Sequence, residues 1–161
     1  MSIIENHSFD ELKPGDSASL VRTLSDKDIT LFALMSGNVN PAHVDAENAK
    51  SDRFHKVIAH GMGRGTLIST ALGTRLSGPG TIYLGQSLRF LHRIYLGDTV
   101  TVAVTVIEPH PENHRVKLDC QVTNQNIGKV ITGLAEFIAP TEKISRPRNE
   151  LPEVELHGKS P

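Results

Sequence analysis

The feature that most constrains the fold of this chain is the stretch from Gly61 to Leu76, which is apolar or small on nearly every face. Glycines interrupt it at positions 63, 65 and 73, between side chains such as Met62 and Ile68. A helix without a polar side is usually buried, and small residues let neighbouring elements approach it closely. The stretch therefore predicts a long, buried central helix that ends at the Gly and Pro residues of 77–80.

The segments after this helix change to a period of two and are rich in Val, Ile, Thr and Leu, which is typical of strands. They span 82–91, 99–107, 115–122 and 130–138, and the short connections between them carry turn residues. Connections this short imply an antiparallel meander. A short strand at 17–24 and a helix capped by Ser25 and ended at Gly37 precede them. This order favours the α+β class and a hotdog fold, an antiparallel sheet wrapped around a long central helix.

Composition narrows the class of protein. The chain has 161 residues and a formal net charge of −1, which suits one compact domain and argues against nucleic-acid binding. The single cysteine, Cys120, excludes an internal disulfide and fits a reducing compartment. The N-terminus does not resemble a signal peptide, and no apolar run approaches the ~20 residues of a membrane span. We expect a cytoplasmic protein that does not bind membranes.

The C-terminal segment differs from the rest of the chain. Residues 141–161 contain Pro147, Pro152 and Pro161 and show no hydrophobic period. The sequence predicts a compact domain over 1–140 followed by a linker or tail over 141–161. Truncation near Glu142 is therefore expected to leave the melting temperature almost unchanged.

Two polar clusters are candidates for a site. The first, Ser-Gly-Asn-Val-Asn-Pro-Ala-His-Val-Asp at 36–45, could be a capping and turn segment or a binding loop. The second, Ala-His-Gly-Met-Gly-Arg-Gly at 59–65, opens the central helix, but its glycine spacing does not match a dinucleotide fingerprint. The free N–H groups of a helix start could instead hold a carbonyl oxygen that becomes negative.

Other patterns carry weaker signals. The histidines of the segment His110–His114 mimic metal-ligand spacing but fall in an expected hairpin loop, and we expect no metal there or between His55 and His60. Cys120 lies in an expected strand as a small buried thiol. The basic residues of 89–93 (Arg89, His92 and Arg93) could meet phosphates, but a solvated strand face is the favoured interpretation.

Together, the two clusters resemble the MaoC-like hydratase family, whose pattern is roughly Ser-Gly-Asp-x-Asn-Pro-x-His followed by His-Gly-Met. The matching residues are Ser36, Gly37, Asn40, Pro41, His43, His60, Gly61 and Met62, and the similarity runs from about Phe9 to Pro140. The resemblance implies a homodimeric hotdog protein with its site between subunits, an acyl-CoA thioester as substrate and no cofactor. The tail at 146–152 also resembles the linker to a phosphate acyltransferase, which implies a fused or associated partner of that kind.

The resemblance also implies site roles. Asn38 stands where the family carries its catalytic aspartate, His43 would orient the water, and the Gly61 N–H would bind the thioester oxygen. The residues expected to contact substrate are Ser36, Asn40, His60, Met62 and Ser69. An asparagine has the shape of aspartate but cannot serve as a general base, a loss of about 10² to 10⁴ in rate. An engineered exchange, a natural change toward a binding role, and His43 acting alone as base are all consistent with the sequence.

The function expected from the resemblance is (R)-specific hydration of 2-enoyl-CoA. The alternative from another class is a non-catalytic domain that binds acyl-CoA, which Asn38 favours. A hotdog thioesterase is a third reading, but such enzymes often place a carboxylate on the central helix, and 61–76 contains no Asp or Glu.

Overall fold

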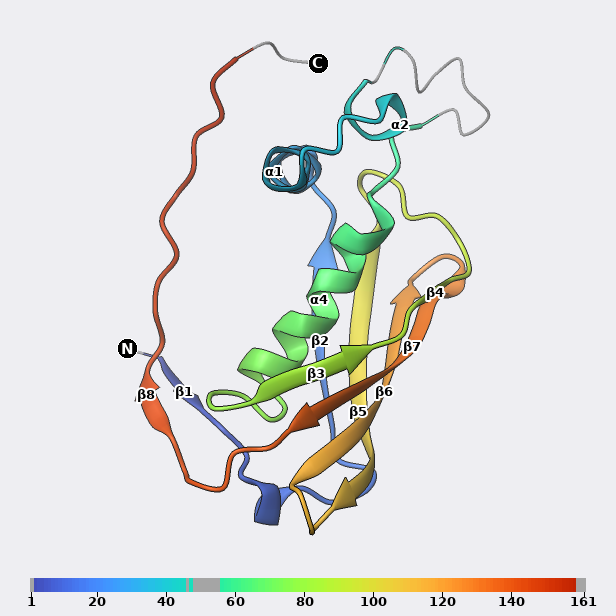
Figure 1. The fold of residues 1–161 in the computed structure, drawn as a ribbon. Coiled ribbons are helices and arrows are strands. Elements are labelled where there is room, and N and C mark those ends of the chain that lie inside the picture. The colour runs from blue at the N-terminus through green and yellow to red at the C-terminus, as the bar shows by residue number, and fades with distance from the viewer. Residues whose placement is uncertain (1, 46, 48–55, 159–161) are drawn as a thin grey trace.

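A six-stranded antiparallel sheet wraps around one long helix in the computed structural model of the protein, which describes residues 2–45, 47 and 56–158 (Figure 1). The helix is α4 (Gly61–Thr74). The strands are β2 (Ser17–Thr23), β3 (Ile82–Gln86), β4 (Arg89–Phe90), β5 (Thr99–His110), β6 (Arg115–Asn124) and β7 (Gly128–Ile138). Their order is β2-β5-β6-β7-β3, and β4 also pairs with β7. The predicted α+β hotdog fold is confirmed.

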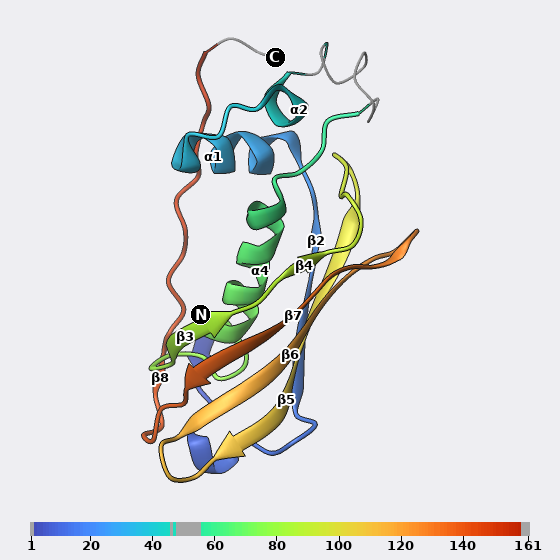
Figure 2. The same ribbon diagram turned by 45° about the vertical axis from the view of Figure 1, so that its right-hand side comes forward.

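The core lies between the concave face of the sheet and α4, as Figure 2 shows from the side. Alternate residues of β5, from Val100 to Val106, are buried, and those between them face outward. Ile68, Ala71 and Leu72 of α4 are at most 2 % exposed and pack into the same cluster. The period of two in the strands thus supplies one apolar face, and that face buries the helix.

Three of the four glycines of α4, Gly61, Gly63 and Gly65, are close-approach positions. A Cβ atom at Gly61 would lie 3.2 Å from the ring of Phe90, and one at Gly63 would lie 3.1 Å from the ring of Phe32. The small residues therefore do admit neighbours, as the sequence predicts. The neighbours are helix α1 (Asp26–Ser36) and the segment around β4 rather than the middle of the sheet.

Helix α1 (Asp26–Ser36) begins and ends where its caps require. Ser25 accepts the Asp28 N–H at 3.1 Å, and the Asp28 carboxylate accepts the Ser25 N–H at 3.0 Å. Gly37 follows with φ of 74°, and its N–H donates to Ala33 at 2.8 Å. The next element, α2 (Pro41–Val44), is a short helix within the cluster at 36–45, and it precedes α4. The chain from 46 to 55 falls mostly outside the described residues.

The strand expected over 82–91 is two strands. The chain leaves the regular register at Ser87, whose N–H donates to Leu134 at 2.9 Å and whose hydroxyl accepts the Leu134 N–H at 3.0 Å. The Ser87 carbonyl oxygen lies directly over Gly133 of β7, in the space that a Cβ would fill. A glycine in β7 therefore permits the close crossing that ends β3 and starts β4.

The segment predicted to be a linker is ordered over its first part. β8 (Ser145–Pro147) pairs antiparallel with β1 (Ile3–Glu5), next to the 3-10 helix η1 (Phe9–Glu11). Asn6 is fully buried; its side chain donates to the Glu142 carbonyl at 2.8 Å and accepts the Ile144 N–H at 2.9 Å. Residues 142–147 thus dock on the N-terminal segment, which corrects the expectation that the whole tail beyond Pro140 is a linker. The pairing was not predictable from periodicity, because both strands are only three residues long.

Candidate active site

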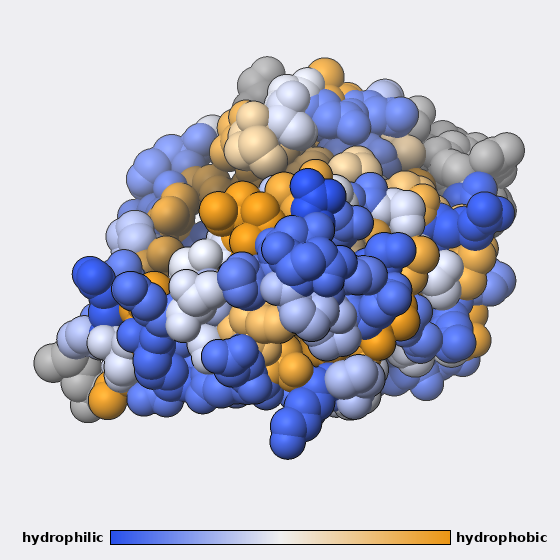
Figure 3. Space-filling view, turned by 60° about the horizontal axis from the view of Figure 1, so that its bottom comes forward, coloured by the Kyte–Doolittle hydropathy of each residue, from blue (hydrophilic) through white to orange (hydrophobic). Residues whose placement is uncertain are grey.

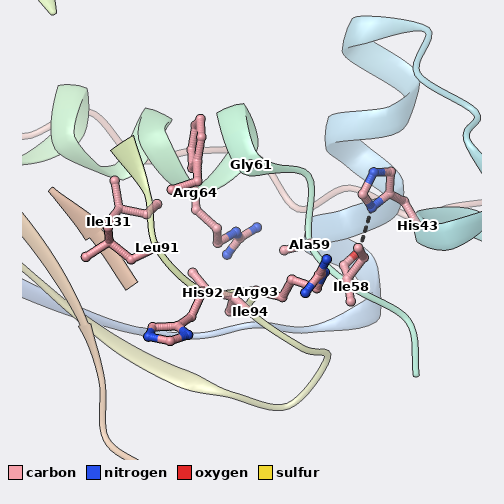
Figure 4. A pocket seen from close by; sticks show the side chains of 11 residues that line it. His43, Ile58, Ala59, Gly61, Arg64, Leu91, His92, Arg93, Ile94 and Ile131 are labelled. Atoms are coloured by element: carbon pink, nitrogen blue, oxygen red, sulfur yellow. Dashed lines mark hydrogen bonds between the residues drawn. The ribbon is translucent and has the colours of Figure 1, made fainter. Parts of the chain in front are cut away.

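A cavity of about 340 Å³ lies where the start of α4 meets α2 and the chain that follows β4 (Figure 4). One part of its wall is buried and largely apolar, and another part is exposed and carries basic side chains. It is lined by His43, Ile58, Ala59, Gly61, Arg64, Phe90, Leu91, His92, Arg93, Ile94 and Ile131. Two of the three residues predicted to be catalytic, His43 and Gly61, therefore face one space.

His43 is held in a single orientation by its own helix and by the chain beside it. Asn40 caps α2 by accepting the Ala42 N–H at 3.1 Å. The Nδ1 atom of His43 lies 2.7 Å from the Ile58 carbonyl oxygen, the dashed line in Figure 4. A carbonyl only accepts, so Nδ1 carries the proton. In the neutral ring Nε2 is then unprotonated and can accept a proton or a hydrogen bond from water.

Gly61 contributes its backbone rather than a side chain. It is the first residue of α4, and the N–H groups of a first helical turn have no acceptor within the helix. They also stand at the positive end of the helix dipole. A carbonyl oxygen placed there would accept a hydrogen bond that becomes stronger as negative charge develops on the oxygen. One such well-placed donor typically lowers the reaction barrier by about 3 kcal/mol.

His60 lies behind His43. It is 3 % exposed, its Nε2 donates to the Asn38 carbonyl oxygen at 3.2 Å, and its ring stacks on that of His43 with centroids 4.0 Å apart. Burial lowers the pKa of His60; the bond to Asn38 opposes this, and the charges of His43 and Arg64 add to the lowering. A neutral His60 therefore fixes both the ring of His43 and the backbone at Asn38.

The loop residues predicted to bind substrate make hydrogen bonds within the loop. The Asn38 side-chain oxygen accepts the Asn40 N–H at 3.1 Å. The Ser36 hydroxyl donates to the Phe32 carbonyl at 2.7 Å and accepts the Asn38 N–H at 3.2 Å. Ser36 and Asn40, predicted to bind substrate, and Asn38, predicted at the catalytic position, are all exposed and lie outside the cavity lining. The structure thus gives them capping and turn roles, and their contact with substrate stays a prediction.

Met62 and Ser69 are exposed on α4 and also lie outside the cavity lining. Only His43 and Gly61 of the predicted site residues line the cavity directly, while His60 supports it from behind. Whether Met62 and Ser69 contact substrate, as the family resemblance implies, stays a prediction.

The structure also places the histidines of 110–114 and Cys120. His110 ends β5 and Arg115 begins β6, so the predicted hairpin loop is confirmed. Cys120 is buried, and burial raises its pKa to about 11, which leaves the thiol protonated at neutral pH. Within the described residues, no group of three or more His, Cys, Asp or Glu side chains could hold a metal ion, and His55 lies outside them.

Of the basic residues after β3, Arg89 lies in β4 and is exposed, as the expected solvated strand face predicts. His92 and Arg93 follow β4 rather than lying within a strand, and both are exposed at the cavity wall. The favoured interpretation, a solvated strand face, is therefore right about their exposure but not about their position.

Sequence reasoning missed Arg64. It is 5 % exposed, lines the cavity one helical turn after Gly61, and its Nε atom has no hydrogen-bond partner in the described part of the chain. A signal was present in the sequence, since Arg64 is the only charged side chain before Arg75 in the otherwise apolar or small stretch that forms α4.

Comparison with known proteins agrees with this geometry. The chain is 46 % identical over 136 residues to an (R)-specific enoyl-CoA hydratase of Rhodospirillum rubrum, covering 83 % of this chain and 92 % of that protein. It is 40 % identical over 112 residues to a 3-hydroxybutyryl-CoA dehydratase of Methylorubrum extorquens, covering 70 % and 71 %. The R-hydratase PhaJ1 of Pseudomonas aeruginosa superposes with a TM-score of 0.93 at 43 % identity, over 97 % of this chain and all of that one. The MaoC like domain family matches residues 13–130, and the chain belongs to this family.

Proposed function

We propose that this protein is an (R)-specific enoyl-CoA hydratase-type domain, which adds water to trans-2-enoyl-CoA to give (R)-3-hydroxyacyl-CoA. The names of its relatives in Rhodospirillum rubrum and Methylorubrum extorquens support this reaction class. The observation that carries the proposal is the pairing, in one cavity, of His43, whose Nδ1 is held by the Ile58 carbonyl, with the first N–H of α4 at Gly61.

The proposed chemistry follows from those two groups. The thioester oxygen accepts the Gly61 N–H, which stabilises the enolate that forms when water attacks. His43 Nε2 holds the water, whose oxygen bonds to the β-carbon while one of its protons ends on the α-carbon. Water is added without oxidation or reduction, so the reaction needs no cofactor.

Asn38 is expected to limit the rate of hydration in this chain. Its amide cannot take a proton at neutral pH, and its oxygen already accepts the Asn40 N–H. Of the residues to which the resemblance gives a catalytic role, His43 is then the one that can still take a proton, and slow turnover is expected. The same observation favours a second candidate function, a domain that binds acyl-CoA without converting it. A thioesterase is disfavoured because α4 carries no carboxylate.

We propose a homodimer as the working form. The edge strand β3 exposes Ile82 and Leu84, which are 57 % and 42 % accessible. An unpaired apolar edge is a site for pairing with a second copy. On the face shown in Figure 3, hydrophobic groups likewise lie in patches between hydrophilic ones.

The proposed compartment is the cytoplasm, in keeping with a single, buried cysteine. No helix in the described ranges is long and apolar enough to cross a membrane. Association with a phosphate acyltransferase stays a prediction from the resemblance of the tail, and co-purification of such an enzyme with the full chain tests it.

One set of assays separates the candidate functions. Calorimetric titration with trans-2-butenoyl-CoA measures binding, loss of the enoyl-thioester absorbance measures hydration, and release of free thiol measures hydrolysis. We expect tighter binding of the enoyl thioester than of free CoA, slow loss of absorbance, (R)-configured product and no thiol release. Binding with no turnover would favour the binding domain; thiol release would identify a thioesterase. No preference over free CoA would contradict the proposal.

A further inference from the structure

Arg64 places a cation inside the candidate active site. Its side chain extends from α4 into the space between that helix and the segment of His92 and Arg93 (Figure 4). It is 5 % exposed, and its Nε has no hydrogen-bond partner among residues 2–45, 47 and 56–158. A buried guanidinium without full pairing is unfavourable, because burial removes hydration that nothing replaces.

The surrounding charges offset this cation only in part. Burial is the main cause that lowers the pKa of Arg64, and an arginine side chain remains protonated nonetheless. The acidic group whose field acts on it is Asp28, and the positive charge of Arg22 opposes that field. The Asp28 carboxylate is already occupied: it accepts from Arg22 at 2.5 Å and from the Ser25 N–H at 3.0 Å. Arg64 therefore lacks a carboxylate of its own among the described residues.

The cavity walls indicate which part of an acyl-CoA would meet Arg64. Its neighbours Ile94 and Ile131 are 4 % and 1 % exposed, whereas His92 and Arg93 lie at the exposed part of the wall. The strongly hydrated phosphates of CoA suit the exposed part. The buried part suits the acyl group, and Arg64 stands only one turn, about 4.5 Å of helix rise, beyond the Gly61 N–H proposed to hold the thioester.

We infer that Arg64 selects acyl-CoA substrates whose short acyl group ends in a carboxylate. This inference rests on the proposed function, because it takes the Gly61 end of the cavity as the thioester site. The carboxylate would accept charge-assisted hydrogen bonds from the planar guanidinium. A methyl-terminated acyl group of the same length would leave the buried cation without a partner.

Calorimetric titration tests the inference without requiring turnover. The probes are glutaryl-CoA and pentanoyl-CoA, which have equal carbon numbers and differ in the terminal carboxylate, with free CoA as the baseline. Hydrogen bonds to charged groups contribute enough to predict a preference of about 10- to 100-fold for glutaryl-CoA. Arg64→Met, which keeps the length of an apolar side chain, should abolish or reverse the preference. Arg115→Met, at the exposed Arg115–Glu136 pair, is the control and should bind as the unchanged protein does.

The outcomes separate this inference from the proposed function. If the unchanged protein binds both acyl-CoAs equally and better than free CoA, the inference is wrong and the function stands. If neither binds better than free CoA, the proposed function fails as well. If Arg64→Met weakens free CoA as much as glutaryl-CoA, Arg64 contacts phosphate and the inference is wrong. If Arg64→Met does not fold, Arg64→Lys is the second variant, because it keeps the charge without the bidentate fork. It should reduce the preference for glutaryl-CoA over pentanoyl-CoA. An unchanged preference in Arg64→Lys would decide against the inference.

Discussion

The imidazole of His43 stacks on that of His60, with centroids 4.0 Å apart and ring planes 28° from parallel. The two rings are tied to different parts of the site, His43 to the Ile58 carbonyl and His60 to the Asn38 carbonyl. Any change in the protonation of one ring acts on the other, because like charges at this distance repel. The stack therefore links the candidate base to the loop that carries Asn38.

This arrangement predicts a stability change near pH 6.5. The pKa of His60 is lowered from its usual 6.5, so the unfolded state binds a proton more readily than the folded state. Stability is then fully present above about pH 6.5 and is lost as the pH falls below it. The lowered carboxyl pKa values of Asp28 and Glu11, from 3.8 and 4.5, act at lower pH.

Urea unfolding at pH 7.5 and pH 5.5 measures the effect. His60→Gln keeps an amide donor for the Asn38 carbonyl but cannot titrate, so it should reduce the difference between the two pH values. His157→Gln, an exposed histidine whose side chain is 85 % accessible, is the control and should behave like the unchanged protein. An equal pH dependence in His60→Gln would show that another group is responsible.

A pair of glycine substitutions tests the close crossing over β7. Gly133→Ala would place a Cβ against the Ser87 backbone, and overpacking of this kind typically costs about 1–3 kcal/mol. Gly73→Ala adds the same methyl group in α4, where nothing lies within 4 Å. Alanine there should stabilise by about 0.5–1 kcal/mol. Thermal unfolding of both variants measures the contrast, and equal melting temperatures would contradict the described crossing.

The tail contributes to stability only over its first residues. Truncation after Pro140 removes the partners of Asn6 and the ion pair of Lys143 with Glu11, whereas truncation after Glu150 leaves both. Buried polar groups left without partners cost about 1–3 kcal/mol each. We expect the shorter chain to melt at least about 5 °C lower and the longer one to melt close to the full chain. A similar small shift in both would restore the linker interpretation for all of 141–161.

The oligomeric state follows from the exposed edge at β3. Two chains of 17.6 kDa would give a mass of about 35 kDa by light scattering at micromolar concentration. Ile82→Lys places a charge on this edge and should shift the protein toward the monomer. A monomer mass for the unchanged protein would contradict the proposed dimer.

The sequence predicted those parts of the fold that depend on local or periodic signals. The capping box at Ser25 and the αL position at Gly37 fixed the bounds of α1, and the period of two located β5, β6 and β7 to within a few residues. The break at Ser87 and the pairing of β1 with β8 escaped prediction. Each depends on a contact between segments far apart in the chain: Gly133 under Ser87 in one case, and Asn6 with Glu142 in the other.

The candidate site was likewise predictable only in part. The family resemblance pointed to His43 and Gly61, and the helix start had already marked the free N–H groups at Gly61; both residues line the cavity. The walls at Ile94, Ile131 and Arg64 come together only when the sheet closes on α4. No local pattern marks them as neighbours, so sequence periodicity could place them in the core but not in one site.

The proposed hydratase function depends most on position 38, where this chain carries Asn38 instead of the aspartate of the family pattern. The direct measurement is the rate of enoyl-thioester absorbance loss with trans-2-butenoyl-CoA for the unchanged protein and for Asn38→Asp. Aspartate adds no volume and supplies a proton acceptor, so turnover should rise by about 10² or more while substrate affinity changes little. His43→Gln in the Asn38→Asp background should remove the gain. Equal rates for the unchanged protein and the Asn38→Asp variant would exclude position 38 as the site of the missing base, because another group would then take the proton.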